Sequence, residues 1–464
     1  ILKLKWWQKK MQISEISKNN LCIDSRKVRK NDIFFDSISS KNKENPYLKE
    51  IIKKKPKKIF SEKKYKLDIF EQKKNINSFF LKVLKKKFKL IPKNIVGVTG
   101  TNGKSSVAFF FKEINKYLGI KCASVGTLGF FVNNKKTLNP LTTPDILTNH
   151  IKLNEFYKKK IKNVIIETSS HGLKQGRLNG IKFKTGIFTN FSQDHLDYHK
   201  SIKNYLHSKL LLFSSLLSKK GTIISNGEIN KNYLKKYKNK KLLYGNCGNT
   251  IKIISIKPSN DSSIVKLNFK NKIIQFKVKL IGKIHIENLV TSILAAISVG
   301  IKIGSILNVL HKIKNPTGRL DLISKNNKKV IIDYAHTPDG LNKVIDNLKS
   351  HFKENIFLIF GCGGDRDKSK RNLMGKIANK QCFKVYITDD NPRFENAKLI
   401  RLQIAKSCKK AEIISSRKKA IKKALKLLKK NQILLIAGKG HENYQIVKNK
   451  YLKFSDYSVV KKFI

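Results

Sequence analysis

A glycine-rich segment at residues 97–106, GVTGTNGKSS, has the residue types that bind phosphate. Its glycines let backbone N–H groups converge on phosphate oxygens, and a helix starting there would add its partial positive charge. Lys104 can reach the terminal phosphates of ATP, and the Ser105 hydroxyl can bind Mg²⁺. The match to the P-loop pattern is imperfect, because Val98 stands where that pattern has its first glycine. A Gly-Lys-Ser sequence also arises by chance in a lysine-rich chain, but its position between a predicted strand and a predicted helix favours an ATP site.

Acidic residues and histidines follow two further predicted strands. Glu167 closes the strand at 164–167, where a carboxylate beside a phosphate loop can hold Mg²⁺ directly or through water. The segment 194–199 contains two aspartates and two histidines within six residues. A single histidine is more often a structural residue, but four such groups in one loop favour a functional site.

These groups need a scaffold that brings the ends of strands together, and the hydrophobic pattern predicts one. Apolar runs at 94–99, 164–167 and 186–189 indicate buried strands, and residues 104–118 have helical spacing. The last third repeats this rhythm, with strands at 330–333, 356–360, 383–388 and 433–437 and a helix at 418–430. Such alternation predicts the α/β class with mainly parallel sheets, whose ligands bind beyond the carboxyl ends of the strands.

The 464 residues are too many for one ordinary core, so we expect several domains. Lysine content and the pattern of apolar runs divide the chain into a lysine-rich first region at 1–93, a central region at 94–315 and a last region at 316–464. The sequence Asn-Pro-Thr-Gly at 315–318 marks the second boundary. A hydrophobic fraction of 40% is enough to build these cores.

Location is indicated by what the sequence lacks. No apolar run reaches the roughly 18–20 residues that a membrane helix needs, and residues 1–7 are too short and too rich in lysine for a signal peptide. The cysteines form no Cys-x-x-Cys pair, which argues against a zinc site or a disulfide framework and favours a reducing compartment, the cytoplasm; they are Cys22, Cys122, Cys247, Cys362, Cys382 and Cys408.

The formal net charge of +68 would ordinarily suggest a nucleic-acid-binding protein. However, the lysines are spread through the whole chain instead of being concentrated in one segment. Runs such as 53–58 and 85–87 lack the interleaved arginines and aromatic residues that read or stack on bases. We therefore predict no specific nucleic-acid partner, although so positive a surface attracts anions in general.

Seven segments, in this order, resemble the Mur ligase family, and within it the members that add meso-diaminopimelate. The resemblance runs from about Asp24 to the C-terminus. The segments are GTNGK at 100–104, SSHG at 169–172, DHLDYH at 194–199, DYAHTPD at 333–339, GCGGDRD at 361–367, DNPR at 390–393 and GKGHE at 438–442.

The resemblance implies an architecture of three domains and a reaction. The first domain would be an α/β domain that binds the UDP end of the substrate, the second a P-loop-type ATPase and the third a Rossmann-like domain. ATP would phosphorylate the D-Glu carboxylate of UDP-MurNAc-L-Ala-D-Glu, and the amine of meso-diaminopimelate would displace phosphate from the acyl phosphate. This step belongs to peptidoglycan precursor synthesis, and hence to cell shape and division, and the enzyme would be a monomer.

The resemblance also assigns residues to the nucleotide and the metal. Lys104, Glu167, His195 and Lys209 would be catalytic, and Lys209 would be carbamylated, which turns a cation into a carboxylate-like ligand. Mg²⁺ would be held by Ser105, Glu167, His195 and the Lys209 carbamate. ATP would be bound by Gly100, Thr101, Asn102, Gly103, Lys104, Ser105, Ser106, Asn288, Arg319 and Asp333.

Two further sets would bind the other substrates. The UDP-linked dipeptide would contact Ser25, Thr142, Thr143, Ser169, Gln175 and Arg177. Diaminopimelate would contact Arg366, Asp390, Asn391, Pro392, Arg393, Gly438 and Glu442. Arg393 can form a bidentate pair with the distal carboxylate, which lysine lacks, so we predict that Arg393 sets specificity. Glu442 can pair with the ammonium group.

Departures from the family pattern leave alternatives open. His285 stands where asparagine is usual, Asp321 replaces glutamate, and the acidic pair usual after Asn226 is lost. The first region lacks its usual glycines at about 31–50. A folylpolyglutamate synthase would share the ATP loop but not residues 390–393. A basic nucleic-acid-binding protein would not need Glu167 or His195, and an inactive relative would not need the four catalytic residues.

Overall fold

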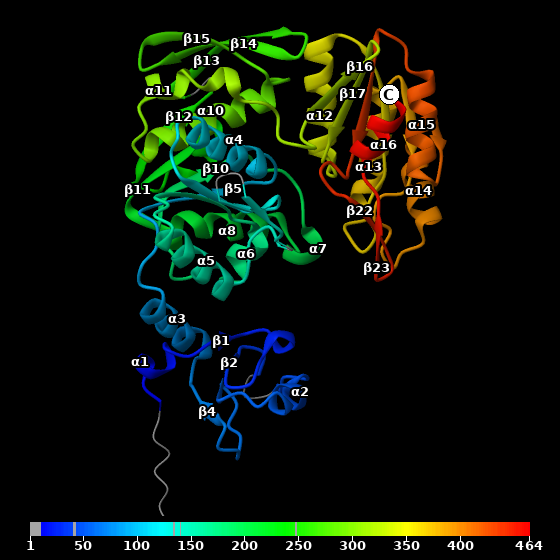
Figure 1. Ribbon diagram of the computed structural model, residues 1–464. Coiled ribbons are helices and arrows are strands. Elements are labelled where there is room, and N and C mark those ends of the chain that lie inside the picture. Colours follow the sequence, from blue (N-terminus) through cyan, green and yellow to red (C-terminus); the bar gives the residue numbers. More distant parts are fainter. Residues whose placement is uncertain (1–10, 40–42, 133–134, 140, 246–247) are drawn as a thin grey trace, which may run out of the picture. The chain divides into compact units, whose positions relative to one another are not determined.

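A computed structural model describes residues 11–39, 43–132, 135–139, 141–245 and 248–464 (Figure 1). The α/β class is confirmed, because helices cover sheets whose strands are mainly parallel. The N-terminal residues 1–7 and Cys247 lie outside the described residues. The described residues divide into two compact units, one built from residues up to 93 with 144–162 and 172–182, the other from 94–143, 163–171 and 183–464.

The first unit contains a small parallel sheet in the order β1-β2-β3-β4. Phe35 lies at its centre and packs against Phe60 at 5.3 Å and Phe80 at 4.4 Å between ring centroids. The elements are β1 (Leu21–Cys22), β2 (Ile33–Asp36), β3 (Lys58–Ser61) and β4 (Phe70–Gln72), with α1 (Ile13–Ile16), α2 (Leu48–Lys53), α3 (Ile76–Lys87) and α5 (Ile146–Lys158).

The central sheet of the second unit carries the glycine-rich loop. Its order is β15-β14-β13-β12-β11-β10-β5-β9-β6-β7-β8, parallel from β13 to β6 and antiparallel at both ends. The parallel strands are β5 (Asn94–Thr99), β6 (Cys122–Gly126), β9 (Asn163–Glu167), β10 (Phe183–Phe188), β11 (Leu217–Asn226) and β12 (Lys240–Tyr244). The outer strands are β7 (Gly129–Val132), β8 (Lys135–Thr137), β13 (Ile251–Ser259), β14 (Ser262–Phe269) and β15 (Lys272–Val278).

Two helices pack together on one face of this sheet, α4 (Lys104–Tyr117) and α10 (Lys283–Ser298) (Figure 1). Their apolar residues join those of β5, β9 and β10 in one core. The predicted helix at 104–118 and the predicted strands at 94–99 and 164–167 are confirmed, and the strand predicted at 186–189 forms the second half of β10. Shorter helices are α6 (Ser170–Lys174), α7 (Leu196–His199), α8 (Ile202–Leu211), α9 (Gly227–Ile229) and α11 (Ile303–Leu307).

The C-terminal sheet has the order β16-β17-β21-β18-β19-β20, with only β16 antiparallel among these strands. Side chains alternate along β17, so Ile331 faces one apolar core and Val330 and Ile332 face another. The strands are β16 (Asp321–Lys325), β17 (Lys328–Asp333), β18 (Asn355–Phe360), β19 (Lys384–Ile387), β20 (Ala411–Ile413) and β21 (Gln432–Ala437), and a separate hairpin is formed by β22 (Tyr444–Val447) and β23 (Lys450–Lys453).

Helices cover both faces of the C-terminal sheet, which explains its continuous apolar strands. They are α12 (Pro338–Phe352), α13 (Ser369–Gln381), α14 (Ala397–Ala405), α15 (Arg417–Leu427) and α16 (Asp456–Phe463). The strand predictions for this part are confirmed to within two residues. The predicted helix at 418–430 extends too far, because Leu428 already has an extended backbone. Among the described helices, none is long and apolar enough to cross a membrane.

A buried ion pair joins the first turns of α15 and α16. Arg417 donates from Nε to Asp456 Oδ1 at 2.7 Å and from Nη2 to Asp456 Oδ2 at 2.8 Å, and neither side chain is exposed. Arg417 Nη2 also donates to the carbonyl of Ala437 at 2.9 Å, at the carboxyl end of β21. The pair therefore fixes the point at which β21 leads into the loop at 438–442.

Removal of one partner should strongly destabilise this part of the chain. We expect Asp456→Asn to lower the free energy of unfolding by about 3–5 kcal/mol, because it leaves a buried guanidinium without its counter-charge. Hydrogen exchange of the β21 and α15 amides measures the effect. The matched control is Glu412→Gln, which removes a partly exposed pair with Lys423 and should cost about 1 kcal/mol or less. Equal effects of the two substitutions would contradict the prediction.

Candidate active site

The glycine-rich loop lies between β5 and α4, and its shape requires glycine. Gly100 has φ 142° and Gly103 has φ 87°. A Cβ at Gly100 would lie 1.9 Å from Thr189 Oγ1, and one at Gly103 would lie 2.6 Å from Asn288 Oδ1. The N–H groups of the first turn of α4 have no carbonyl partner within the helix, so they are available to an anion.

Two lysines converge on the carbonyl of Gly100. Lys104 Nζ donates to it at 2.9 Å and to Thr101 O at 2.8 Å. Lys209 Nζ donates to the same Gly100 oxygen at 2.8 Å and lies 4.2 Å from the ring centre of Tyr205. Burial, with the charge of Lys104, holds the pKa of Lys209 well below its usual range. Lys209 is therefore biased toward the neutral amine, the form that reacts with carbon dioxide.

Glu167 ends β9 and is buried beside the loop. Its Oε2 accepts from Ser105 Oγ at 2.8 Å and its Oε1 from the Thr127 N–H at 3.0 Å. Burial raises the pKa of Glu167, while the charge of Lys104 lowers it. A Cβ at Gly126 would lie 2.0 Å from Glu167 Oε1, so a glycine there leaves room for the carboxylate.

The oxygen donors of Ser105 and Glu167 fit Mg²⁺, which prefers oxygen and takes its remaining ligands from phosphates and water. Within the described residues, no group of three or more His, Cys, Asp and Glu side chains is arranged to hold a metal ion by itself. A metal here would therefore depend on the nucleotide for part of its coordination.

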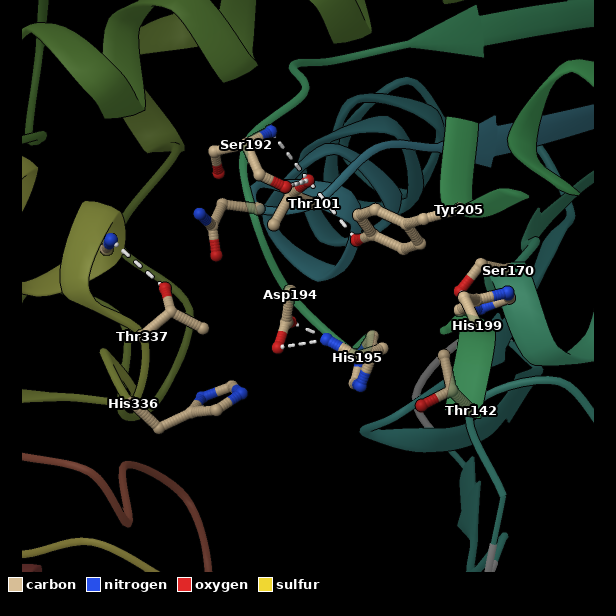
Figure 2. Close-up of polar contacts among 12 residues, drawn as sticks. Thr101, Thr142, Ser170, Ser192, Asp194, His195, His199, Tyr205, His336 and Thr337 are labelled. Atoms are coloured by element: carbon tan, nitrogen blue, oxygen red, sulfur yellow. Dashed lines mark hydrogen bonds and ion pairs between the residues drawn. The ribbon is translucent and has the colours of Figure 1, made fainter. Parts of the chain in front are cut away.

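The loop at 194–199 separates into two kinds of residue. Asp194 and His195 face the cavity, and the backbone N–H of His195 donates to Asp194 Oδ1 at 2.9 Å. Figure 2 shows His336 on the side of Asp194 away from His195. His199 is buried and hydrogen-bonds to Ser170 Oγ at 3.0 Å, which makes it structural. Burial is the main cause that lowers the pKa of His195, while the charge of Asp194 raises it.

Residues from the C-terminal part complete this site. Asp333 is buried and accepts from the N–H groups of Leu320 and Ala335, both at 2.7 Å. The Arg319 guanidinium lies 4.3 Å from the ring centre of Tyr334. Burial raises the pKa of Asp333, and the charge of Arg319 opposes that shift.

A direct contact links the C-terminal part to the glycine-rich loop. Asp339, in the first turn of α12, accepts from Asn102 Nδ2 at 3.2 Å and from Ser192 Oγ at 3.0 Å. Of these groups, Asn102 lines a cavity of about 580 Å³. Its walls include all the residues predicted to bind ATP or metal except Gly100, namely Thr101, Asn102, Gly103, Lys104, Ser105, Ser106, Glu167, His195, Lys209, Asn288, Arg319 and Asp333.

The departures from the family pattern have local structural roles. His285 lines the cavity, and its Nδ1 lies 2.7 Å from Asn315 Oδ1, while burial lowers the pKa of His285 to about 4. Asp321 Oδ2 accepts from the Gly318 N–H at 3.1 Å. Asn226 caps α9, accepting from the Ile229 N–H at 2.7 Å. Of these residues, His285 is neutral at physiological pH, because burial lowers its pKa to about 4.

The residues predicted to bind the UDP-linked dipeptide belong to both units. Thr142 and Ser169 line the cavity, whereas Thr143 is buried and donates to the Glu167 carbonyl at 2.7 Å. Ser25, Gln175 and Arg177 belong to the first unit, where Arg177 Nε donates to Gln175 Oε1 at 2.8 Å.

The residues predicted to bind diaminopimelate lie together at the carboxyl ends of β18, β19 and β21. Asn391 Nδ2 donates to Glu442 Oε2 at 3.0 Å, and Arg393 Nη1 donates to the Gly364 carbonyl at 2.9 Å. Asp390 and Asn391 are buried, and Arg393 is half-buried. Pro392 is buried between them, Gly438 lies against Asp390, and Arg366 is exposed on the loop after β18.

The hairpin β22–β23 holds Arg393 in place, a role that the sequence did not indicate. Arg393 has φ 51°, and its backbone N–H donates to Ile446 O at 3.0 Å while its carbonyl accepts from the Lys448 N–H at 2.7 Å. Gln445 Nε2 donates to the carbonyls of Asp389 and Asp390 at 3.2 and 3.1 Å. A second residue that the sequence did not indicate, Lys439, is buried and contacts Asp390, Asn391 and Glu442.

The parallel sheets, the glycine loop before a helix and the buried carboxylate beside it define a phosphate-binding α/β protein of the P-loop type. The Mur ligase middle domain matches residues 98–296, and the Mur ligase, glutamate ligase domain matches residues 318–440. A UDP-N-acetylmuramoyl-L-alanyl-D-glutamate–2,6-diaminopimelate ligase of Wigglesworthia glossinidia brevipalpis is 38% identical, covering 97% of this chain and 96% of that protein. The chain belongs to the Mur ligase family.

Other relatives agree with this assignment. The ligase of the same name from Rickettsia conorii is 37% identical, covering 96% of this chain and 95% of its own. A solved structure of such a ligase superposes with a TM-score of 0.67 at 28% identity, covering 96% and 94% of the two chains. The MurF ligase from Thermotoga maritima in complex with ADP superposes with a TM-score of 0.66 at 16% identity, covering 92% and 95%, and shares the fold.

The shape of the loop should be sensitive to a single methyl group. We expect Gly100→Ala to weaken ADP binding by more than about tenfold, because the added Cβ overlaps Thr189 and strains the backbone. Isothermal titration calorimetry measures the affinity. Gly300→Ala is the control, since Gly300 also has a positive φ, of 101°, but a Cβ there meets nothing within 4 Å. Similar affinities of the two variants would contradict this account of the loop.

Proposed function

We propose that the protein is an ATP-dependent ligase that joins meso-2,6-diaminopimelate to the D-Glu carboxylate of UDP-MurNAc-L-Ala-D-Glu, forming ADP and phosphate. This reaction makes a precursor of peptidoglycan. The observation that carries the proposal is the position of Arg393 and Glu442 at the strand ends of a sheet whose Asp333 lines the phosphate-loop cavity, together with Arg319, which directly precedes the first strand of that sheet. One domain thus presents groups to both the nucleotide and the amino acid.

The nucleotide step relies on positioning and charge neutralisation. In the proposed roles, the first turn of α4 and Lys104 hold the terminal phosphates of ATP, and Asn288, Arg319 and Asp333 hold the rest of the nucleotide. Ser105, Glu167, His195 and the Lys209 carbamate would hold Mg²⁺, which offsets phosphate charge during transfer. A D-Glu carboxylate oxygen then attacks the γ-phosphorus, the bond to the β-phosphate oxygen breaks, and ADP leaves.

The second step forms the amide bond. The neutral amine of diaminopimelate attacks the carbonyl carbon of the acyl phosphate, and phosphate leaves from the tetrahedral intermediate. The proton released from the amine ends on phosphate or solvent. The chain keeps the amine close to the acyl phosphate by binding the rest of diaminopimelate through Asp390, Asn391 and Glu442, and so converts a bimolecular encounter into a positioned reaction.

Specificity for diaminopimelate is assigned to the distal end of the amino acid. Arg393 can form a bidentate pair with its carboxylate, assisted by Arg366 at the exposed rim. Lysine has no carboxylate there, so the guanidinium would gain nothing from it.

Domain roles complete the proposal. Residues 1–93 would bind the UDP end through Ser25, with Gln175 and Arg177 from the same unit, while Thr142, Thr143 and Ser169 would approach the dipeptide. Residues 94–315 would be the ATPase and residues 316–464 the amino-acid domain. We further propose that a monomer carries out the reaction in the cytoplasm, where ATP is available.

The first test compares amino acids directly. With ATP, Mg²⁺ and UDP-MurNAc-L-Ala-D-Glu, we expect phosphate release and tripeptide only with meso-diaminopimelate, not with L-lysine or without an amino acid. Arg393→Ala should raise the KM for diaminopimelate about 10- to 100-fold and leave the KM for ATP unchanged, because it removes one charge-assisted pair. Turnover with lysine equal to that with diaminopimelate would contradict the specificity assignment, and no turnover with any amine in the folded protein would contradict the ligase assignment.

The Lys209 carbamate has a spectroscopic test. Because the pKa of Lys209 is depressed, its amine is neutral at a lower pH than that of an ordinary lysine, so carbamate should form at a lower pH than on a surface lysine and be lost on acidification. With ¹³C-bicarbonate, we expect a protein-bound carbamate signal in the ¹³C spectrum and its absence in Lys209→Ala. Lys184→Ala, which alters a lysine of the same unit bonded to Asn94, should keep the signal. A spectrum that is the same for wild type and Lys209→Ala would exclude the modification.

A further inference from the structure

Lys439 is a lysine whose ammonium is enclosed by the amino-acid site. It is 0% exposed, although it belongs to an exceptionally lysine-rich chain whose lysines mostly lie at the surface. Its Nζ lies 2.9 Å from Asn391 Oδ1, 3.0 Å from Glu442 Oε2 and 3.5 Å from Asp390 Oδ1. Its three donors therefore point at three residues already assigned to the amino acid.

The contacts of Lys439 fix how Asn391 and Glu442 are presented. Asn391 Oδ1 accepts from Lys439 and from the Ile446 N–H at 3.0 Å, so its Nδ2 must face Glu442 Oε2, to which it donates at 3.0 Å. Glu442 Oε2 is thereby occupied twice by protein donors. Among the residues that the structure describes, its other oxygen, Oε1, has only a long contact of 3.4 Å from the Tyr334 hydroxyl. Glu442 Oε1 is the oxygen left to receive a ligand ammonium.

The loop is shaped to turn this lysine inward. Gly438 and Gly440, on either side of Lys439, have φ of 111° and 52°. A Cβ at Gly438 would lie 2.8 Å from Asp390 Oδ2, and one at Gly440 would lie 2.7 Å from Gly318 O. Only glycines allow the backbone to pass this close to its neighbours while Lys439 points into the protein.

Lys439 also offsets the charge of the two carboxylates that it contacts. Two carboxylates that share a buried site cannot both stay ionised without a nearby cation. Lys439 supplies that cation for Asp390 and Glu442, while Arg417 is already neutralised by Asp456. The cluster of Lys439, Asp390 and Glu442 therefore holds one net negative charge, the complement of a single ammonium.

We propose that Lys439 is the positioning residue of the amino-acid site: it orients Asn391 and Glu442, and it sets the site's charge so that one ligand ammonium is accepted. The inference rests on the proposed ligase function and deepens it, since Lys439 acts through its neighbours and need not touch the substrate.

The test is Lys439→Ala, assayed beside wild type for the KM of diaminopimelate, the KM of ATP and the melting temperature. We expect the KM for diaminopimelate to rise about 10- to 100-fold while the KM for ATP stays within about twofold, because buried carboxylates lose their partner. Propylammonium chloride should lower the raised KM in a concentration-dependent way, since it can fill the vacated space with the same charge. Lys328→Ala is the matched control, a lysine of the same sheet whose Nζ bonds to Leu425 O at 2.8 Å.

The outcomes separate the possibilities. An unchanged KM for diaminopimelate, or equal rises of both KM values with no response to propylammonium, would overturn the positioning role. If Lys439→Ala does not fold, Lys439→Gln, which keeps donors but not the charge, should fold and still raise only the KM for diaminopimelate; an unchanged KM would again overturn it. A wild-type protein that never uses diaminopimelate would instead refute the proposed function.

Discussion

The arrangement around the glycine-rich loop depends on the carbonyl of Gly100, an acceptor that two buried lysines share. Two lysines from different elements, Lys104 and Lys209, donate to it, and burial together with the charge of Lys104 lowers the pKa of Lys209, so the two need not both be charged. Gly100 has a positive φ of 142°, and both lysines that donate to its oxygen also line the cavity beside the first turn of α4. Glu167 then offsets the charge of Lys104 from the next strand. The shape of the loop, the protonation of the two lysines and the position of the Glu167 carboxylate therefore depend on one another.

The same principle organises the C-terminal site, with a different acceptor. Arg417 donates to the Ala437 carbonyl. The chain then turns at Gly438 and Gly440, so that the Lys439 ammonium contacts Asp390 and Glu442. In both sites a buried cation is held by backbone oxygens or carboxylates before any ligand arrives. Such preorganisation lowers the cost of arranging charges during the reaction. The large surface charge of the chain is a separate matter, because those lysines are solvated and individually contribute little.

The fold could be predicted well from hydrophobic pattern, because a buried parallel strand and an amphipathic helix leave different periodicities. The loop at 100–106 and Glu167 could be found because their residue types and their positions at strand ends both point to phosphate. The role of His199 could not be settled from the sequence, since whether a histidine faces a cavity or Ser170 depends on the turn at His195, which has φ 53°. The end of α15 was missed because Leu428 continues the helical spacing while packing in the core from an extended backbone.

The roles of Lys439 and of the hairpin β22–β23 could not be predicted from the sequence at all. Among 99 lysines and arginines, residue type alone cannot indicate which cation is buried. The hairpin acts through its main chain: Ile446 and Lys448 bind Arg393 by backbone groups that any residue possesses. Side-chain chemistry is readable from sequence, but main-chain contacts between distant segments follow only from the folded topology. The same reasoning applies to the departures at His285 and Asp321, because Lys104, Lys209 and the backbone of Arg393 are held by main-chain atoms of other residues.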